Sequence, residues 1–113
     1  MIMRKANDIE YKNLKNCHDG EGTLFCKSLL VGFESSKFAF MHYDLIKEGV
    51  SIGEHPHTNH EEVYFLLSGT GTLIYDGKEY DMASGDVSLC NLGHSHGFIA
   101  KTDCIMIVVG WKY

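Results

Sequence analysis

The residues in this sequence most able to do chemistry are histidines, and five of the seven lie in two short segments. The first segment is residues 55–62 (HPHTNHEE) and the second is residues 93–97 (GHSHG). Side chains alternate faces along a strand, so His55 and His57 point the same way, with Cβ atoms roughly 7 Å apart. Imidazole nitrogens bind a transition metal at about 2.0–2.2 Å. A strand that curves around an ion, as the wall of a small barrel does, would bring both rings to it.

A carboxylate follows the first histidine pair. Glu62 opens the apolar run at residues 63–67 (VYFLL), where burying an unpaired ion costs several kcal/mol. A bound metal supplies a reason for the charge, whereas the alternative is that Glu61 and Glu62 cap an exposed strand start. The histidines on either side of this carboxylate in the sequence favour the metal. Pro56 cannot donate to a strand ladder, which predicts an edge, an end or a bulge.

The elements that must position these side chains are short β-strands. Twelve glycines, a single proline and the absence of any sustained helical period predict an all-β domain. Asp76-Gly77 is a strong hairpin signal. Nine strands are expected, at residues 24–31, 37–46, 51–57, 61–68, 71–75, 78–82, 86–90, 95–99 and 104–111. Residues 1–22 are polar and form an N-terminal arm that folds onto the body or onto a second copy, and residues 23–113 form one barrel or sandwich.

Composition excludes several kinds of partner. The 113 residues suffice for one core, and a formal charge of −5 with a single arginine, Arg4, argues against nucleic acid and anionic membrane as partners. No targeting signal or membrane-spanning run is visible, so a cytoplasmic location is expected. The four cysteines include no CxxC pair and are expected to be free thiols.

Two motifs in this chain resemble the signatures of the cupin family. Residues 49–69 read G-x5-H-x-H-x4-E-x6-G, which matches the first cupin signature, and residues 85–96 read G-x5-N-x-G-x2-H, which follows the second. The usual proline of the second signature is Asn91 here, and its usual final asparagine is Ala100. Together with the strands around them, the motifs cover about residues 38–111. Overall, the sequence resembles small single-domain bacterial cupins described as similar to mannose-6-phosphate isomerase.

The resemblance implies an all-β, double-stranded β-helix (jelly-roll) cupin barrel that holds one divalent transition metal ion. By position, the implied ligands are His55, His57, Glu62 and His96. Glu61 is the rival carboxylate, but only Glu62 leaves six residues before Gly69. The ligand set suits Mn, Fe, Co, Ni, Cu or Zn without choosing among them. Cupin barrels commonly pair, so a homodimer is expected.

Other residues near the motifs have open roles. His94 shares a face with His96 and is a candidate acid–base residue, a group supporting the ligands, or a loop histidine. Tyr64 and Phe98 are candidate substrate-binding residues, with core packing as the alternative. His60 is interpreted as a solvated loop residue. His18 and His42 have no motif support and are interpreted as ordinary surface or strand residues.

Three functions follow as hypotheses. The first is a small metalloenzyme acting on a small oxygenated metabolite such as a sugar, enol or keto acid, by isomerase-like or dioxygenase-like chemistry. The second is a non-catalytic binding or sensor protein that holds a small-molecule ligand on the metal. The third is a structural barrel without metal. A fold alone does not choose among them.

Overall fold

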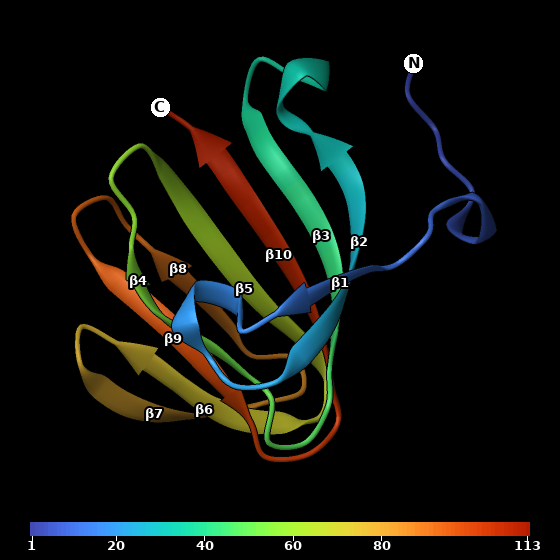
Figure 1. Cartoon of the computed structure of the whole chain (residues 1–113). Coiled ribbons are helices and arrows are strands. Elements are labelled where there is room, and N and C mark those ends of the chain that lie inside the picture. The colour runs from blue at the N-terminus through green and yellow to red at the C-terminus, as the bar shows by residue number, and fades with distance from the viewer.

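The computed structural model describes all 113 residues and consists of β-strands with three single-turn 3-10 helices (Figure 1). The strands are β1 (Lys12–Lys15), β2 (Thr23–Val31), β3 (Phe38–Ile46), β4 (Ser51–Pro56), β5 (His60–Ser68), β6 (Thr70–Tyr75), β7 (Lys78–Ala83), β8 (Val87–Cys90), β9 (Ser95–Ala100) and β10 (Cys104–Lys112). The helices are η1 (Ala6–Asp8), η2 (Cys17–Asp19) and η3 (Gly32–Glu34). No helix of the chain is long and apolar enough to span a bilayer. The predicted all-β class is confirmed.

The strands form two antiparallel sheets that enclose the interior of a barrel. The six-stranded sheet has the order β1-β2-β3-β10-β5-β8, and the four-stranded sheet has the order β4-β9-β6-β7. From β3 onward the chain passes repeatedly between the sheets, so that strands distant in sequence lie side by side (Figure 1). This alternation between two sheets is the jelly-roll arrangement that was predicted.

All nine predicted strands are present, each within one residue of its expected ends. The predicted hairpin joins β6 to β7, and its two turn residues, Asp76 and Gly77, have φ angles of 48° and 76°. Positive φ at both positions is what a two-residue turn between twisted strands requires. β1 was not predicted, because KNLK shows no apolar alternation.

Part of the N-terminal arm lies against its own barrel. β1 pairs antiparallel with β2, with Leu14 opposite Leu24. The next turn, η2, packs on β4 so tightly that a Cβ added at Gly53 would lie 1.9 Å from the carbonyl oxygen of His18. Residues before β1 lie on the outer side of β2 (Figure 1), where Arg4 donates to the carbonyl oxygen of Leu29 and Lys27 donates to that of Ala6. The arm therefore brings η2, and with it His18, to the wall of the barrel.

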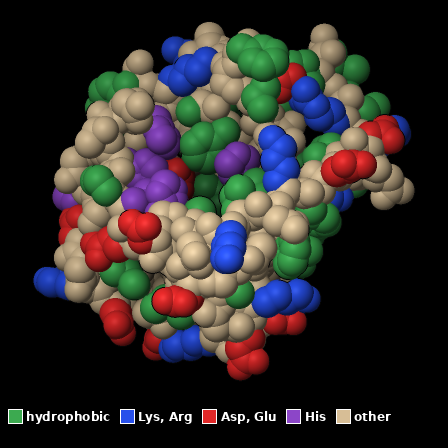
Figure 2. All heavy atoms as spheres, viewed as in Figure 1, with side chains coloured by type: hydrophobic (Ala, Val, Ile, Leu, Met, Phe, Trp, Pro, Cys, Tyr) green, Lys and Arg blue, Asp and Glu red, His purple; other side chains and the backbone are tan.

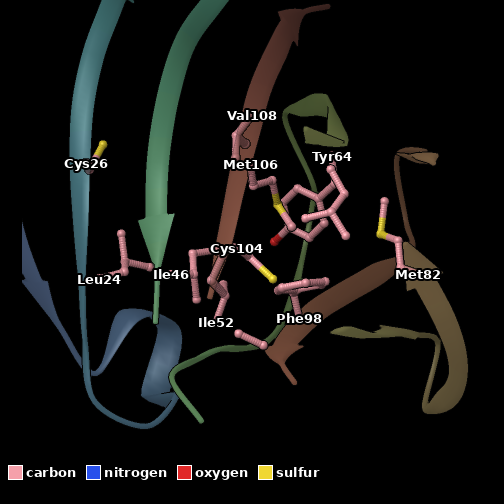
Figure 3. Close-up of a cluster of buried hydrophobic side chains, with 12 residues drawn as sticks. Leu24, Cys26, Ile46, Ile52, Tyr64, Met82, Phe98, Cys104, Met106 and Val108 are labelled. Carbon is pink, nitrogen blue, oxygen red and sulfur yellow. The ribbon is translucent and has the colours of Figure 1, made fainter. Parts of the chain in front are cut away.

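The hydrophobic core fills one end of the interior and sets the level of the site. Leu66, Phe98 and Met106 are fully buried within it (Figure 3). Each such side chain contributes about 1.5–3 kcal/mol through burial. On β10, Met106 is paired with Asp44 and Leu66, whereas Val108 is paired with His42 and Tyr64. Polar side chains therefore enter the interior at both levels, Asp44 beside Met106 and His42 beside Val108, and the site begins where the apolar core ends.

Candidate metal centre

The four side chains proposed as ligands from the motifs lie together inside the barrel. His55 comes from β4, Glu62 from β5 and His96 from β9, while His57 directly follows β4. All four are buried, and one nitrogen or oxygen atom from each lies within 4.8 Å of the others. His55 is paired with His96 across β4 and β9. β4 is an edge strand with an irregular register between Ile52 and His55, as Pro56 predicted.

The distances fit the binding of a single cation. Nε2 of His57 lies 2.8 Å from Nε2 of His96, and Oε1 of Glu62 lies 3.1 Å from Nε2 of His96. Two ligands at right angles, each about 2.1 Å from one ion, are about 3.0 Å apart. The Nε2 atom of His55 is buried without a hydrogen-bond partner. An unpartnered buried lone pair is costly, and a metal at the centre of the cluster would satisfy it.

Neighbouring groups hold the histidine rings in place. Nδ1 of His55 donates to the carbonyl oxygen of Gly53 at 2.7 Å, which leaves Nε2 as the atom available to a metal. The His18 ring stacks on His55 with a centroid distance of 3.5 Å, and the Tyr64 ring stacks on His96 at 4.1 Å. Both pairs are nearly parallel, with an interplanar angle of 11°. These contacts restrict the rotation of two of the three candidate imidazole ligands.

The electrostatics favour the protonation states that metal ligands need. Burial lowers the pKa of His57 to about 4 and also lowers the pKa of His55, so both rings are neutral at pH 7. Burial alone would raise the pKa of Glu62, but the hydrogen bond with His96 and the electrostatic effect of the neighbouring histidine rings outweigh it, and the net shift is downward. Neutral rings at His55 and His57 beside an ionised Glu62 are the forms that bind a divalent cation.

Of the other residues considered from the sequence, His60 contacts this cluster, whereas Glu61, His94 and Phe98 lie elsewhere. Glu61, the rival carboxylate, points elsewhere and accepts a hydrogen bond from Asn91 at 2.7 Å. His60, interpreted as a loop residue, instead begins β5, with its Nε2 3.4 Å from Glu62. His94 is half exposed and pairs with Asp76 at 2.5 Å, outside the barrel interior. Phe98 packs in the hydrophobic core.

A small cavity adjoins the cluster and is lined by two of the four candidate ligands, His55 and Glu62. Its volume is 140 Å³, about that of five water molecules in the liquid and well below the range of drug-sized pockets. Figure 2 shows a hollow at the centre of one face, with histidine side chains on its wall. Its polar lining residues are His18, His42, Asp44, His55, Glu62 and Tyr64, and its other lining residues are Leu14, Cys17, Phe40, Ile52 and Val108. A larger groove, of 750 Å³, follows residues 3–12 of the arm and contains none of the four ligands.

Three of the polar lining residues, His18, His42 and Asp44, were not identified from the sequence as part of a site. His42 and Asp44 are inward-facing residues of β3, and His18 reaches the cavity through the contact between η2 and β4. Cys26, His42 and Asp44 also form a second group whose ligating atoms lie within 4.8 Å of one another. For the two β3 residues a signal was available in the sequence: His42 and Asp44 are polar residues at alternate positions between the apolar Phe40 and Ile46. Nothing in the sequence indicates the position of His18.

Comparison with known proteins places this geometry in a family. A family model described as a cupin domain matches residues 41–110. The chain is 32% identical over 111 residues to an L-ectoine synthase of Rhodococcus erythropolis, covering 96% of this chain and 82% of that protein. It is 29% identical over 100 residues to an oxalate-binding protein of Thermotoga maritima, covering 85% of this chain and 79% of that protein.

Solved structures give the same result. The crystal structure of a predicted oxalate decarboxylase from Thermotoga maritima superposes with a TM-score of 0.92 at 26% identity, covering 100% of both chains. Ectoine synthase from P. lautus superposes with a TM-score of 0.81 at 20% identity, covering 99% of this chain and 78% of that one. The second likeness concerns the fold alone. With both motifs, the two-sheet barrel and the matched domain in agreement, the chain belongs to the cupin family.

Proposed function

We propose that this cupin is a metal-dependent enzyme that acts on a small oxygenated metabolite held on the metal. The observation that carries the proposal is the buried cluster of three histidines and Glu62 beside a cavity of 140 Å³. Four protein ligands leave two positions of a six-coordinate ion for a substrate, and the small cavity beside them favours a substrate of only a few carbon atoms.

The chain's own residues supply binding, orientation and a proton donor. A bound divalent metal would polarise a carbonyl, stabilise an enolate or lower the pKa of water. The hydroxyl of Tyr64 is buried without a partner, and burial raises the pKa of this phenol well above its ordinary value. It therefore stays protonated and available to donate a hydrogen bond to a ligand. Leu14, Ile52 and Val108 limit the space for water around that ligand.

A second candidate function is binding of a small carboxylate without turnover. The observation that favours it is the similarity to a protein named for oxalate binding. In this structure His94, the one candidate acid–base residue from the sequence, is half exposed and pairs with Asp76, so it is not beside the candidate metal ligands. Both candidates need the same metal, and they differ in whether a bound ligand is transformed.

Metal-loaded protein distinguishes the two functions. We would add Mn²⁺ to chelator-treated protein, mix it with small keto acids, hydroxy acids and sugars, and follow each by proton NMR. The enzyme proposal expects at least one compound to be converted, with conversion lost in Glu62→Gln and retained in Glu61→Gln. Saturable binding without conversion of any compound supports the second candidate, and absence of both binding and conversion contradicts both.

A further inference from the structure

The cavity has a second polar wall, formed by residues of β3 that belong to no cupin motif. In the six-stranded sheet, β10 lies between β3 and β5. His42 on β3 and Tyr64 on β5 are both paired with Val108 of β10. Their backbones are therefore two strand spacings apart, about 10 Å. Asp44 is the next inward-facing residue on β3 and lines the same cavity.

Asp44 carries a polar atom with no partner in the protein. Its side chain is buried, with 4% of the residue exposed, and its Oδ1 atom has no hydrogen-bond partner. The thiol of Cys26 contacts the carboxyl group and partly offsets the effect of burial, which raises the pKa of Asp44 to about 6. At pH 7.5 the group is therefore mostly ionised.

No positive charge within the cavity compensates this carboxylate. Burial lowers the pKa of His42 and of His18, so both rings are neutral at pH 7.5. Lys12 acts on His42 from β1, where its residue is exposed, and forms no ion pair with Asp44. A buried anion whose only side-chain partner is a thiol is costly to the folded protein. Such a group in a ligand cavity points to a function in binding.

We propose that Asp44, assisted by His42, binds the far end of the metal-held ligand by accepting a hydrogen bond from its hydroxyl or amino group. This inference rests on the proposed function, since the metal holds the other end. It assigns a ligand class: a small acid with a chelating pair of oxygens at one end and an O–H or N–H donor about three carbons away. A second carboxylate at that end would be repelled by Asp44.

Three four-carbon acids with the same chelating end test this assignment. They are 2-hydroxybutyrate, 4-amino-2-hydroxybutyrate and malate, whose far ends are a methyl, an ammonium and a carboxylate group. We would titrate each into Zn²⁺-loaded protein at pH 7.5 by calorimetry. A hydrogen bond between charged groups predicts that the amino compound binds at least about tenfold more tightly than 2-hydroxybutyrate, and that malate binds more weakly.

The variant Asp44→Asn provides the matched comparison. We expect it to bind one Zn²⁺ and 2-hydroxybutyrate as the wild type does, but to lose the preference for the ammonium group to within about threefold. A merely structural residue would change all three affinities together. The comparison of the three acids on wild-type protein tests the inference even if the variant does not fold.

The outcomes separate this inference from the proposed function. Equal binding of the three acids by the wild type, or an unchanged preference in Asp44→Asn, overturns the role of Asp44 and leaves the metal-bound ligand in place. Two Zn²⁺ ions per chain, falling to one in Asp44→Asn, overturns it as well, since Asp44 would then bind a second metal with Cys26 and His42. Failure of all three acids to bind overturns both proposals.

Discussion

Replacing Asp44 by asparagine should stabilise the metal-free protein at neutral pH and leave it nearly unchanged in acid. The pKa of this buried carboxyl is raised from 3.8 to about 6. A group with a raised pKa in the folded state binds its proton more tightly when folded. Its stabilising contribution is complete below pH 3.8 and is lost as the pH rises through about 6.

The size of the effect follows from that difference. Two pH units correspond to about 3 kcal/mol in the free energy of unfolding, of which about 2 kcal/mol falls between pH 4.5 and 7.5. The carboxamide that replaces the carboxyl group cannot ionise, so the variant does not lose this stability. The difference in unfolding free energy between variant and wild type should therefore grow by about 2 kcal/mol over that range, whatever the substitution itself costs.

Urea unfolding followed by circular dichroism, with chelator present, measures this difference at pH 4.5, 6 and 7.5. Asp81→Asn is the control, because the Asp81 side chain is 93% exposed. Its effect should vary by less than about 0.5 kcal/mol with pH. If the effect of Asp44→Asn is equally constant, the carboxyl group is solvated or paired with a charge in solution, and the argument from an uncompensated buried anion is wrong.

The remaining predictions concern the support of the site. Gly53→Ala should separate η2 from β4, since the new Cβ would lie 1.9 Å from the carbonyl oxygen of His18. We expect it to lower the free energy of unfolding in urea by about 1–3 kcal/mol. An unchanged midpoint of urea unfolding would contradict that contact. Tyr64→Phe should leave the unfolding free energy within about 1 kcal/mol of wild type, or raise it, because the lost hydroxyl has no partner. The same variant should weaken binding of 2-hydroxybutyrate in calorimetry, and unchanged affinity would remove Tyr64 from the ligand site. In metal-free Asp44→Asn, the free energy of unfolding should fall by up to about 3 kcal/mol as the pH falls from 6.5 to about 4. The reason is that the lowered pKa of His57 keeps its ring neutral in the folded protein, whereas the ring becomes protonated in the unfolded chain. An unfolding free energy that does not change over this pH range would show that the ring is not buried.

The sequence was most informative where spacing and alternation act together. Nine strands followed from short apolar runs between turn residues, and Asp76-Gly77 gave the correct hairpin because positive φ restricts residue choice. The resemblance of the two motifs to the cupin signatures implied the four side chains that lie together in the structure. The strands and the hairpin depend on local chemistry that a single segment can express, and each motif is likewise a short continuous segment.

The features that the sequence did not predict, such as the places of Asp44, His18 and Phe98 in the barrel, depend on contacts between distant segments. Asp44 lies in a strand whose residues on both faces are largely apolar, so alternation did not reveal which face lines the cavity. His18 has a φ of 50° and stacks on His55 only because η2 packs on Gly53. Phe98 shares a face with His96 on β9, yet its side chain packs in the core and is not among the cavity-lining residues.

The direct test of the central proposal is the metal content of protein purified without affinity nickel or chelator, combined with anomalous X-ray diffraction from its crystals. One transition metal ion per chain is expected, with an anomalous peak among the imidazoles of His55, His57 and His96 and the carboxylate of Glu62. His96→Ala should retain less than about a tenth of that metal, whereas Glu61→Gln should retain all of it. A peak at other residues, or metal-soaked crystals with no peak at these four side chains, would contradict the account.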